Sequence, residues 1–157
     1  MHYEKKKNEN EIRVRIQKYC ATQERCTFDV KKKLNEWDIK PELSKIIIKD
    51  LIAENFINEE RFAILFANSK LRIRKWGRIK IKHEMKKKFL QDSDIIKGID
   101  SIDLILYKET LQELLIKKSS VKEQNIFKKK QKIINYLVQK GFEYELVWEH
   151  LNNYTDK

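Results

Sequence analysis

The stretch IKHEMKKKFLQDSDIIKGI, residues 81–99, decides the fold because its apolar residues follow the spacing of two short helices. The series is Ile81, Met85, Leu90, Ile95 and Ile99. The first two residues stand four positions apart, as do the last two, so each pair lies on one helix face. The longer steps in the middle leave room for a turn. The pattern therefore predicts two helices joined by a short turn, with their apolar faces on a common core.

The same apolar spacing occurs in two other parts of the chain, at a period of about 51 residues. The earlier series is Val30, Leu34, Ile39, Leu43 and Ile47. The later series is Ile133, Leu137, Phe142, Leu146 and Leu151. A further apolar helix face precedes each pair, over about residues 10–22, 59–75 and 104–118. We therefore expect three modules of three helices each.

Composition favours the same all-α architecture. Among 157 residues there are three Gly and one Pro, and 41% are apolar, which is enough for a packed interior. Because each module is too small for a comfortable core of its own, neighbours should pack together into an elongated, curved rod of helix-turn-helix-like repeats. The expected division is a flexible N-terminus over residues 1–10 and modules over 11–57, 58–103 and 104–157.

Several local features refine this prediction. Pro41 suits the first turn of a helix, Gly141 suits a left-handed turn, and the run Asp92-Ser93-Asp94 can supply an N-cap. Phe89 stands at the position equivalent to Gly141, where a bulky side chain is disfavoured, so the turn there is expected to differ. Residues 79–82 alternate like a strand, but the repeat places them on a helix. In the helix over about residues 59–75, we expect one face to point into the core, namely that of Phe62, Phe66, Ser69 and Ile73.

The charge balance points to an anionic partner. Lys and Arg number 35 against 24 Asp and Glu, for a formal charge of +11, which attracts polyanions and acidic protein surfaces. The sequence has neither an apolar run of about 18 residues nor a signal-peptide pattern at its start. We therefore expect a cytoplasmic monomer that does not bind a membrane.

Chemistry-bearing motifs point away from an enzyme. There is no nucleophile elbow, Gly-rich phosphate loop or cofactor fingerprint, so we expect no catalytic residue, no cofactor and no metal site. His2, His83 and His150 are far apart and lack metal-ligand spacing. Cys20 reads as a small core residue, whereas Cys26, near a helix start, could have a lowered thiol pKa.

Three segments carry a resemblance to a known family. They are FINEERFAILFANSKLRIRKWGRIKIKHEM (56–85), YCATQERCTFDVKKKL (19–34) and KKKQKIINYLVQKGFEYELVWEHL (128–151). In these segments the chain resembles the RecX family of recombination regulators. It departs from the family pattern at Asn55 and Phe89, where Gly is frequent, and at Cys26, where Ser is common. The run Asn58-Glu59-Glu60 stands where the family usually has an Asp pair.

The resemblance implies both a fold and a partner. RecX-like proteins consist of three tandem three-helix modules and dock in the groove of the RecA nucleoprotein filament. There they restrain strand exchange, ATP hydrolysis and co-protease activity. The implied partners are RecA and the DNA held inside the filament, with weak binding to DNA alone. Whether such a protein caps growing filaments, dissolves formed ones or locks them remains open at this stage.

Residues 72–88, RIRKWGRIKIKHEMKKK, contain the densest positive charge in the chain. They form either a nucleic-acid or partner surface or a solvated helix face. Trp76 could stack on a base or pack between helices, and Gly77 could permit a turn between two helices or a close backbone approach to a partner. Arg61 could serve its own helix, join modules by an ion pair or contact the partner. The candidate residues are Arg61, Arg72, Arg74, Lys75, Trp76, Arg78, Lys80, Lys82, Lys86 and Lys87.

Three functions are compatible with these residues. The first is a non-enzymatic modulator of the RecA filament, as the resemblance implies. The second is an autonomous basic DNA-binding module that does not depend on RecA. The third is a helical-repeat scaffold for another acidic protein.

Overall fold

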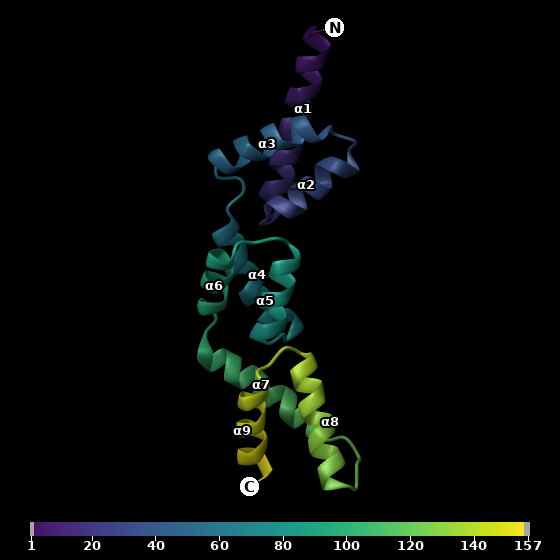
Figure 1. The fold of residues 1–157 in the computed structure, drawn as a ribbon, viewed down its shortest axis with the longest axis vertical. Coiled ribbons are helices and arrows are strands. Elements are labelled where there is room, and N and C mark those ends of the chain that lie inside the picture. The colour runs from purple at the N-terminus through teal and green to yellow at the C-terminus, as the bar shows by residue number, and fades with distance from the viewer. Residues whose placement is uncertain (1, 156–157) are drawn as a thin grey trace.

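The structure is a computed structural model that describes residues 2–155, and within them the chain forms helices and no strand (Figure 1). The helices are α1 (His2–Thr22), α2 (Thr27–Glu36), α3 (Pro41–Ala53), α4 (Glu59–Arg74), α5 (Arg78–Lys87), α6 (Asp92–Asp100), α7 (Leu104–Ser119), α8 (Ile126–Gln139) and α9 (Tyr144–Thr155). They gather in three successive groups of three along an elongated rod. The all-α repeat architecture is therefore confirmed, whereas the module boundaries stay a prediction.

The core residues are those that the repeat identified. Every member of the three apolar series is buried or half-buried. Ile16, Val30 and Ile47 belong to a core formed by α1–α3, while a second core runs continuously through α4–α9. Cys26, at the start of α2, is buried in this second core and so connects the first group to the rest. Neighbouring modules thus share apolar contacts, as expected for a tandem repeat.

The first helix begins earlier than the spacing predicts. It was expected from about residue 10, because residues 2–9 are polar and offer no apolar face, but α1 begins at His2. Glu and Lys favour the helical conformation even without packing, which accounts for the extension. The flexibility expected for residues 1–10 stays a prediction, and Met1 lies outside the described residues. Among the residues described, no helix is both long and apolar enough to cross a membrane.

The turns within the three helix pairs share one conformation, contrary to the expectation for Phe89. Asp38, Phe89 and Gly141 have φ angles of 55°, 59° and 97°, all in the left-handed region. This region costs a residue with a Cβ about 1–2 kcal/mol, so Phe89 is held there by the helices on either side. The N-cap of α6 is Gln91, which makes no side-chain cap bond, and Asp92 and Asp94 lie in the first turn instead. The N-cap expected from the Asp92-Ser93-Asp94 run is therefore wrong.

Helix α4 packs through a different face from the one predicted. Ser69 is exposed and Ile73 is 75% exposed, whereas Ala63, Ala67 and Leu71 are buried beside Phe62. The reason is a close approach between α4 and α6. A Cβ on Gly98 of α6 would lie 2.7 Å from the Ala63 carbonyl oxygen, so small residues are needed on both helices. Of the large apolar residues on the expected face, Phe62 is buried, Phe66 is half-buried and Ile73 is exposed.

Candidate functional site

The basic stretch 72–88 folds as the end of α4, a short connection and the whole of α5. Lys75 closes α4 in a left-handed conformation with φ 56°, and its N–H donates to the Leu71 carbonyl. Gly77 is extended and precedes α5, so Lys75 rather than Gly77 makes the left-handed turn. Ile81 and Met85 are buried, which confirms the helical interpretation of residues 79–82 and its inward face.

Four cations of this stretch are exposed and have no ion pair within the described part of the chain: Arg72, Arg74, Lys82 and Lys86. Lys82 and Lys86 stand one helical turn apart and project from the same face of α5. We call them the α5 pair. Lys87 is also exposed, but its amine lies 2.9 Å from a Glu84 carboxylate oxygen, which partly offsets its charge.

Trp76 lies at a helix junction, where it is half-buried and packs against the core of α4–α9. The amines of Lys70 and Lys80 stand over its ring, 5.3 and 4.8 Å from the centroid. Both lysines can therefore interact with the ring electrons. The indole thus packs at the junction and carries two lysine amines over its ring, and Lys80 is itself half-buried.

Gly77 takes part in a backbone contact between the central and last groups of helices. Its N–H donates to the Lys140 carbonyl at 2.8 Å, and the Ile79 N–H donates to the Gly141 carbonyl at 3.0 Å. A Cβ on Gly77 would lie only 2.2 Å from the Gly141 carbonyl carbon. We call the pair Gly77 and Gly141 the glycine joint. The close approach considered for Gly77 was to a partner, whereas in the structure Gly77 approaches Gly141 of the same chain.

Arg78 supports the same junction and is less available to a partner than the sequence suggests. Its guanidinium donates to Glu143 at 2.6 Å and stands over the Tyr107 ring, 4.5 Å from the centroid. Its backbone N–H donates to the Tyr107 hydroxyl, which in turn donates to Glu143 at 2.7 Å. Burial is the main cause that raises the pKa of Tyr107, so this hydroxyl stays a donor.

Two other candidate cations are also engaged within the chain. Lys75 pairs with Glu113 of α7 at 3.2 Å. Arg61 pairs with Glu24, which precedes α2, and donates to the Asn55 carbonyl at 3.1 Å. Arg61 therefore ties the first and central groups of helices together. Such partly exposed pairs contribute about 0–1 kcal/mol each.

Two further cations, Lys117 and Lys140, join this surface, although the sequence pattern did not single them out. The Lys140 amine donates to the Arg74 carbonyl at 3.0 Å. Burial and the charges of Lys80, Lys117 and Arg74 lower the pKa of Lys140. We call Arg74, Lys80, Lys117 and Lys140 the joint cluster. Lys117 and Lys140 are far in sequence from residues 72–88, so local charge density does not reveal this cluster. The repeat does place Lys140 at the position equivalent to Lys88.

The cysteines are buried thiols rather than reactive ones. Burial raises the pKa of Cys20 to about 11 and that of Cys26 to about 12. The core position expected for Cys20 is confirmed, whereas the lowered pKa considered for Cys26 is wrong, because burial outweighs its place at a helix start. Among the side chains that the structure describes, those of residues 8–154, there is also no group of three or more His, Cys, Asp or Glu arranged to hold a metal ion.

Fold and surface together define a class: an all-α tandem-repeat protein, built from three-helix modules, with exposed cations on its central module. Family models for the second and third three-helix domains of RecX match residues 58–100 and 107–151, which together make up more than half of the chain. The chain belongs to the RecX family.

Individual relatives agree with this assignment. "Regulatory protein RecX" of Clostridium perfringens (strain 13 / Type A) is 28% identical over 120 residues, which are 74% of this chain and 56% of the relative. The protein of the same name from Lactobacillus johnsonii is 31% identical over 134 residues, 82% of this chain and 48% of the relative. The chain therefore spans about half the length of the curated relatives that it matches.

Solved structures share the fold. The crystal structure of RecX from Lactobacillus salivarius has a TM-score of 0.81 at 22% identity and covers 94% of this chain and 96% of its own. A second crystal structure of regulatory protein RecX has a TM-score of 0.80, also at 22% identity, and covers 92% of this chain and 71% of its own. The likeness extends to all three groups of helices.

Proposed function

We propose that this chain is a regulatory protein that binds the RecA nucleoprotein filament and inhibits its ATPase, recombinase and co-protease activities in DNA repair and the SOS response. Membership in the RecX family supports this proposal, since the curated relatives are named regulatory proteins. The observation on this chain that carries it is the set of exposed cations without ion pairs, Arg72, Arg74 and the α5 pair. They stand in the central module, where a partner that spans the rod is in reach.

The shape of the molecule suits such a partner. A RecA filament on DNA is a long helical polyanion, and a rod can follow a groove in it while touching more than one protomer. Each exposed cation adds a modest electrostatic contribution in water. Several along one rod add up, and they also speed the encounter with an anionic surface.

A second candidate function is binding to DNA without RecA, and the joint cluster favours it. Burial first, and then the charges of Lys80, Lys117 and Arg74, lower the pKa of Lys140. A phosphate placed among them would relieve this repulsion. This function predicts binding to bare single-stranded DNA that weakens steeply with salt, by about 0.7 in log–log slope for each phosphate contacted. A flat salt response would exclude it.

ATP hydrolysis by the RecA of the same host, on single-stranded DNA, tests the main proposal. The chain is titrated at two salt concentrations, either before or after filament assembly. We expect hydrolysis to fall at substoichiometric amounts of the chain, and the order of addition separates capping of growth from action on assembled filaments. Unchanged hydrolysis at equimolar chain would contradict the proposal.

A further inference from the structure

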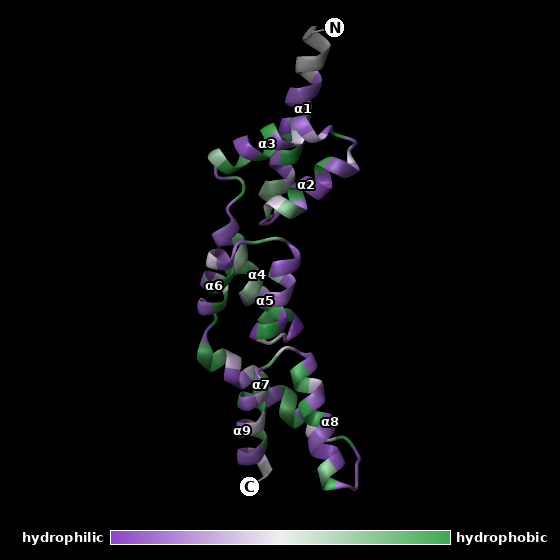
Figure 2. Cartoon of the chain, in the orientation of Figure 1, coloured by the Kyte–Doolittle hydropathy of each residue, from purple (hydrophilic) through white to green (hydrophobic). Residues whose placement is uncertain are grey.

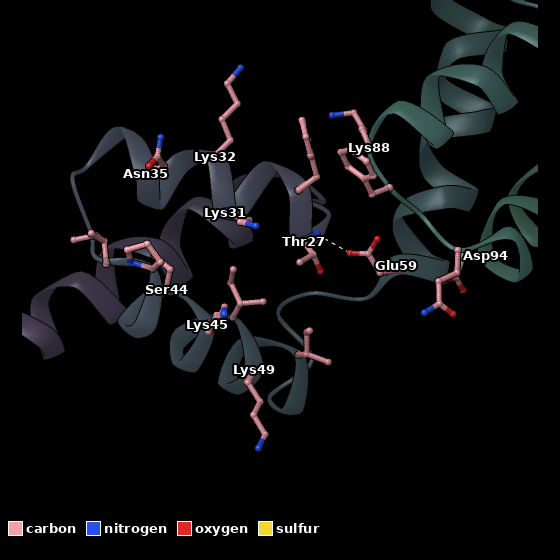
Figure 3. Close-up of a pocket in the computed structure, with 17 residues that line it drawn as sticks. Thr27, Lys31, Lys32, Asn35, Ser44, Lys45, Lys49, Glu59, Lys88 and Asp94 are labelled. Atoms are coloured by element: carbon pink, nitrogen blue, oxygen red, sulfur yellow. Dashed lines mark hydrogen bonds between the residues drawn. The ribbon is translucent and has the colours of Figure 1, made fainter.

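A groove of about 1080 Å³ lies between the first and central groups of helices. One wall is formed by α2 and α3, and the other by the start of α4, the α5–α6 turn and the start of α6 (Figure 3). The two walls are held together by Lys88, whose amine lies 2.6 Å from Asp29, and by Glu59, which accepts a hydrogen bond from the Thr27 N–H. The groove is thus a built feature of the junction.

The floor of the groove is apolar and open to solvent. It is formed by Phe28, Ile39, Ile48, Ile52 and Phe89. Ile52 is 50% exposed and Phe89 is 82% exposed, which are large values for apolar side chains that face one hollow. The ring centroids of Phe28 and Phe89 lie 5.8 Å apart, so the two tilted rings form one aromatic surface in the groove. A contiguous apolar surface of this kind marks an interaction site.

The rim of the groove is positive. Lys31 and Lys32 of α2 and Lys45 and Lys49 of α3 are exposed, and none has an ion pair with a side chain of residues 8–154. Two acids line the groove: Glu59 already accepts the Thr27 hydrogen bond, and Asp94 lies in the first turn of α6, on the wall opposite the four lysines. The rim therefore offers several positive charges for which the groove itself supplies little compensation.

Phe89 contributes more to this groove than to the stability of the chain. It adopts a left-handed conformation, which disfavours a bulky side chain, and most of its ring is in water. The equivalent turns carry Asp38 and Gly141, which tolerate this conformation better. Costly conformations that bring little packing in return are found preferentially at functional sites.

We propose that the groove binds an acidic amphipathic peptide segment of a protein partner, with Phe89 as its aromatic anchor. Apolar side chains of the peptide cover the floor, and its carboxylates face the lysines of the rim. Nucleic acid fits less well, because its phosphates match the rim but leave the exposed aliphatic side chain of Ile52 uncovered. The proposal deepens the proposed function and rests on it only in taking the partner to be a protein.

The test uses the full chain and a fluorescent helical probe peptide with Leu at i, i+3, i+4 and i+7 and Glu elsewhere. Fluorescence anisotropy reports its affinity. Phe89→Asn should weaken binding roughly tenfold, as for an interface anchor, while leaving the melting temperature at or above that of the parent. The double variant Lys45→Glu, Lys49→Glu should also weaken binding, whereas Lys108→Glu, Lys122→Glu, with the same charge change outside the groove, should bind like the parent.

Three outcomes would overturn the proposal. The first is equally tight binding by a probe in which every Leu is replaced by Ser, which would mean that charge alone drives binding. The second is a Phe89→Asn variant that binds the probe as tightly as the parent does. The third is displacement of the peptide from the groove by oligothymidylate, which would make nucleic acid its ligand. ATP hydrolysis by RecA is measured in parallel. Peptide binding in the groove with no effect on RecA would contradict only the proposed function. Inhibition of RecA without peptide binding would contradict only the proposal for the groove.

Discussion

Met85 illustrates how one residue sets the orientation of the basic helix. It is fully buried one turn after Ile81, so Lys82 and Lys86 are directed outward. The same side chain packs in the core that runs from α4 to α9. A change at this position therefore affects the fold and the presentation of the cations together.

Met85→Asp should destabilise the protein by about 3–5 kcal/mol, because it removes buried apolar contacts and places a carboxylate without a partner in the core. Thermal and denaturant unfolding measure the effect. Met85→Leu is the matched control and should cost less than about 1.5 kcal/mol. An Asp variant as stable as the parent would show that α5 is oriented differently.

Cys20 and Cys26 make stability depend on alkaline pH. Burial raises the pKa of the two thiols to about 11 and about 12, whereas in the unfolded chain they titrate near the reference value of 9.0. Above this value the unfolded chain binds fewer protons than the folded one, so stability falls as pH rises toward 11–12. The slope is roughly 1.4 kcal/mol per pH unit for each thiol within its window.

Denaturant unfolding at a series of pH values from 7 to 11 checks this dependence. Below the reference value both thiols are neutral in both states, and no contribution is expected. The variant Cys20→Ala, Cys26→Ala should lose the part of the slope that begins near pH 9. If its slope equals that of the parent, the thiols are not held neutral by burial.

At the scale of helices and turns, spacing predicts much of the fold and contacts across the chain decide the rest. The repeat identified the apolar side of α5 and α8 through Ile81 and Ile133, because helix periodicity is local. It did not identify the buried face of α4, since that depends on Gly98 approaching Ala63 from another helix. The turn at Phe89 follows its equivalents because the flanking helices outweigh the local preference of the residue.

The candidate site, too, is predicted from the sequence only in part. Exposure of the α5 pair follows directly from the helix pattern. The ion pairs of Arg61 and Arg78 within the chain do not follow from the helix pattern, because their partners Glu24 and Glu143 come from distant segments. Lys140 joins the surface for the same reason. Local charge density could therefore locate the surface but could not tell which of its cations are already paired.

The glycine joint gives a test at this scale. Gly77→Ala forces a Cβ into the Gly141 backbone and should break the Gly77–Lys140 hydrogen bond of 2.8 Å. Overpacking of this kind costs typically about 1–3 kcal/mol. Thermal unfolding should show the loss, and small-angle X-ray scattering should show a changed rod. Ser69→Ala, on the exposed side of α4, is the control and should change neither; an unaltered Gly77→Ala variant would refute the joint.

At the scale of the whole molecule, the protein is a rod with hydrophilic residues along its whole length, while its hydrophobic residues gather where helices meet (Figure 2). Two surfaces stand out from this general background. The exposed cations of the central module are suited to an anionic filament, and the groove beside Phe89 to an acidic peptide. A partner that engages both would be held along much of the rod, so each surface alone need only be weak.

We expect the exposed cations of the central module to meet the filament. The most direct test compares the concentration for half-inhibition of RecA ATP hydrolysis between the parent, the α5-pair variant Lys82→Glu, Lys86→Glu, and the control variant Lys108→Glu, Lys122→Glu. All three should fold alike, since the changed side chains are exposed. We predict that the α5-pair variant needs roughly tenfold more protein and that the control matches the parent. Equal half-inhibition by all three would contradict the account and leave the α5 pair a solvated helix face.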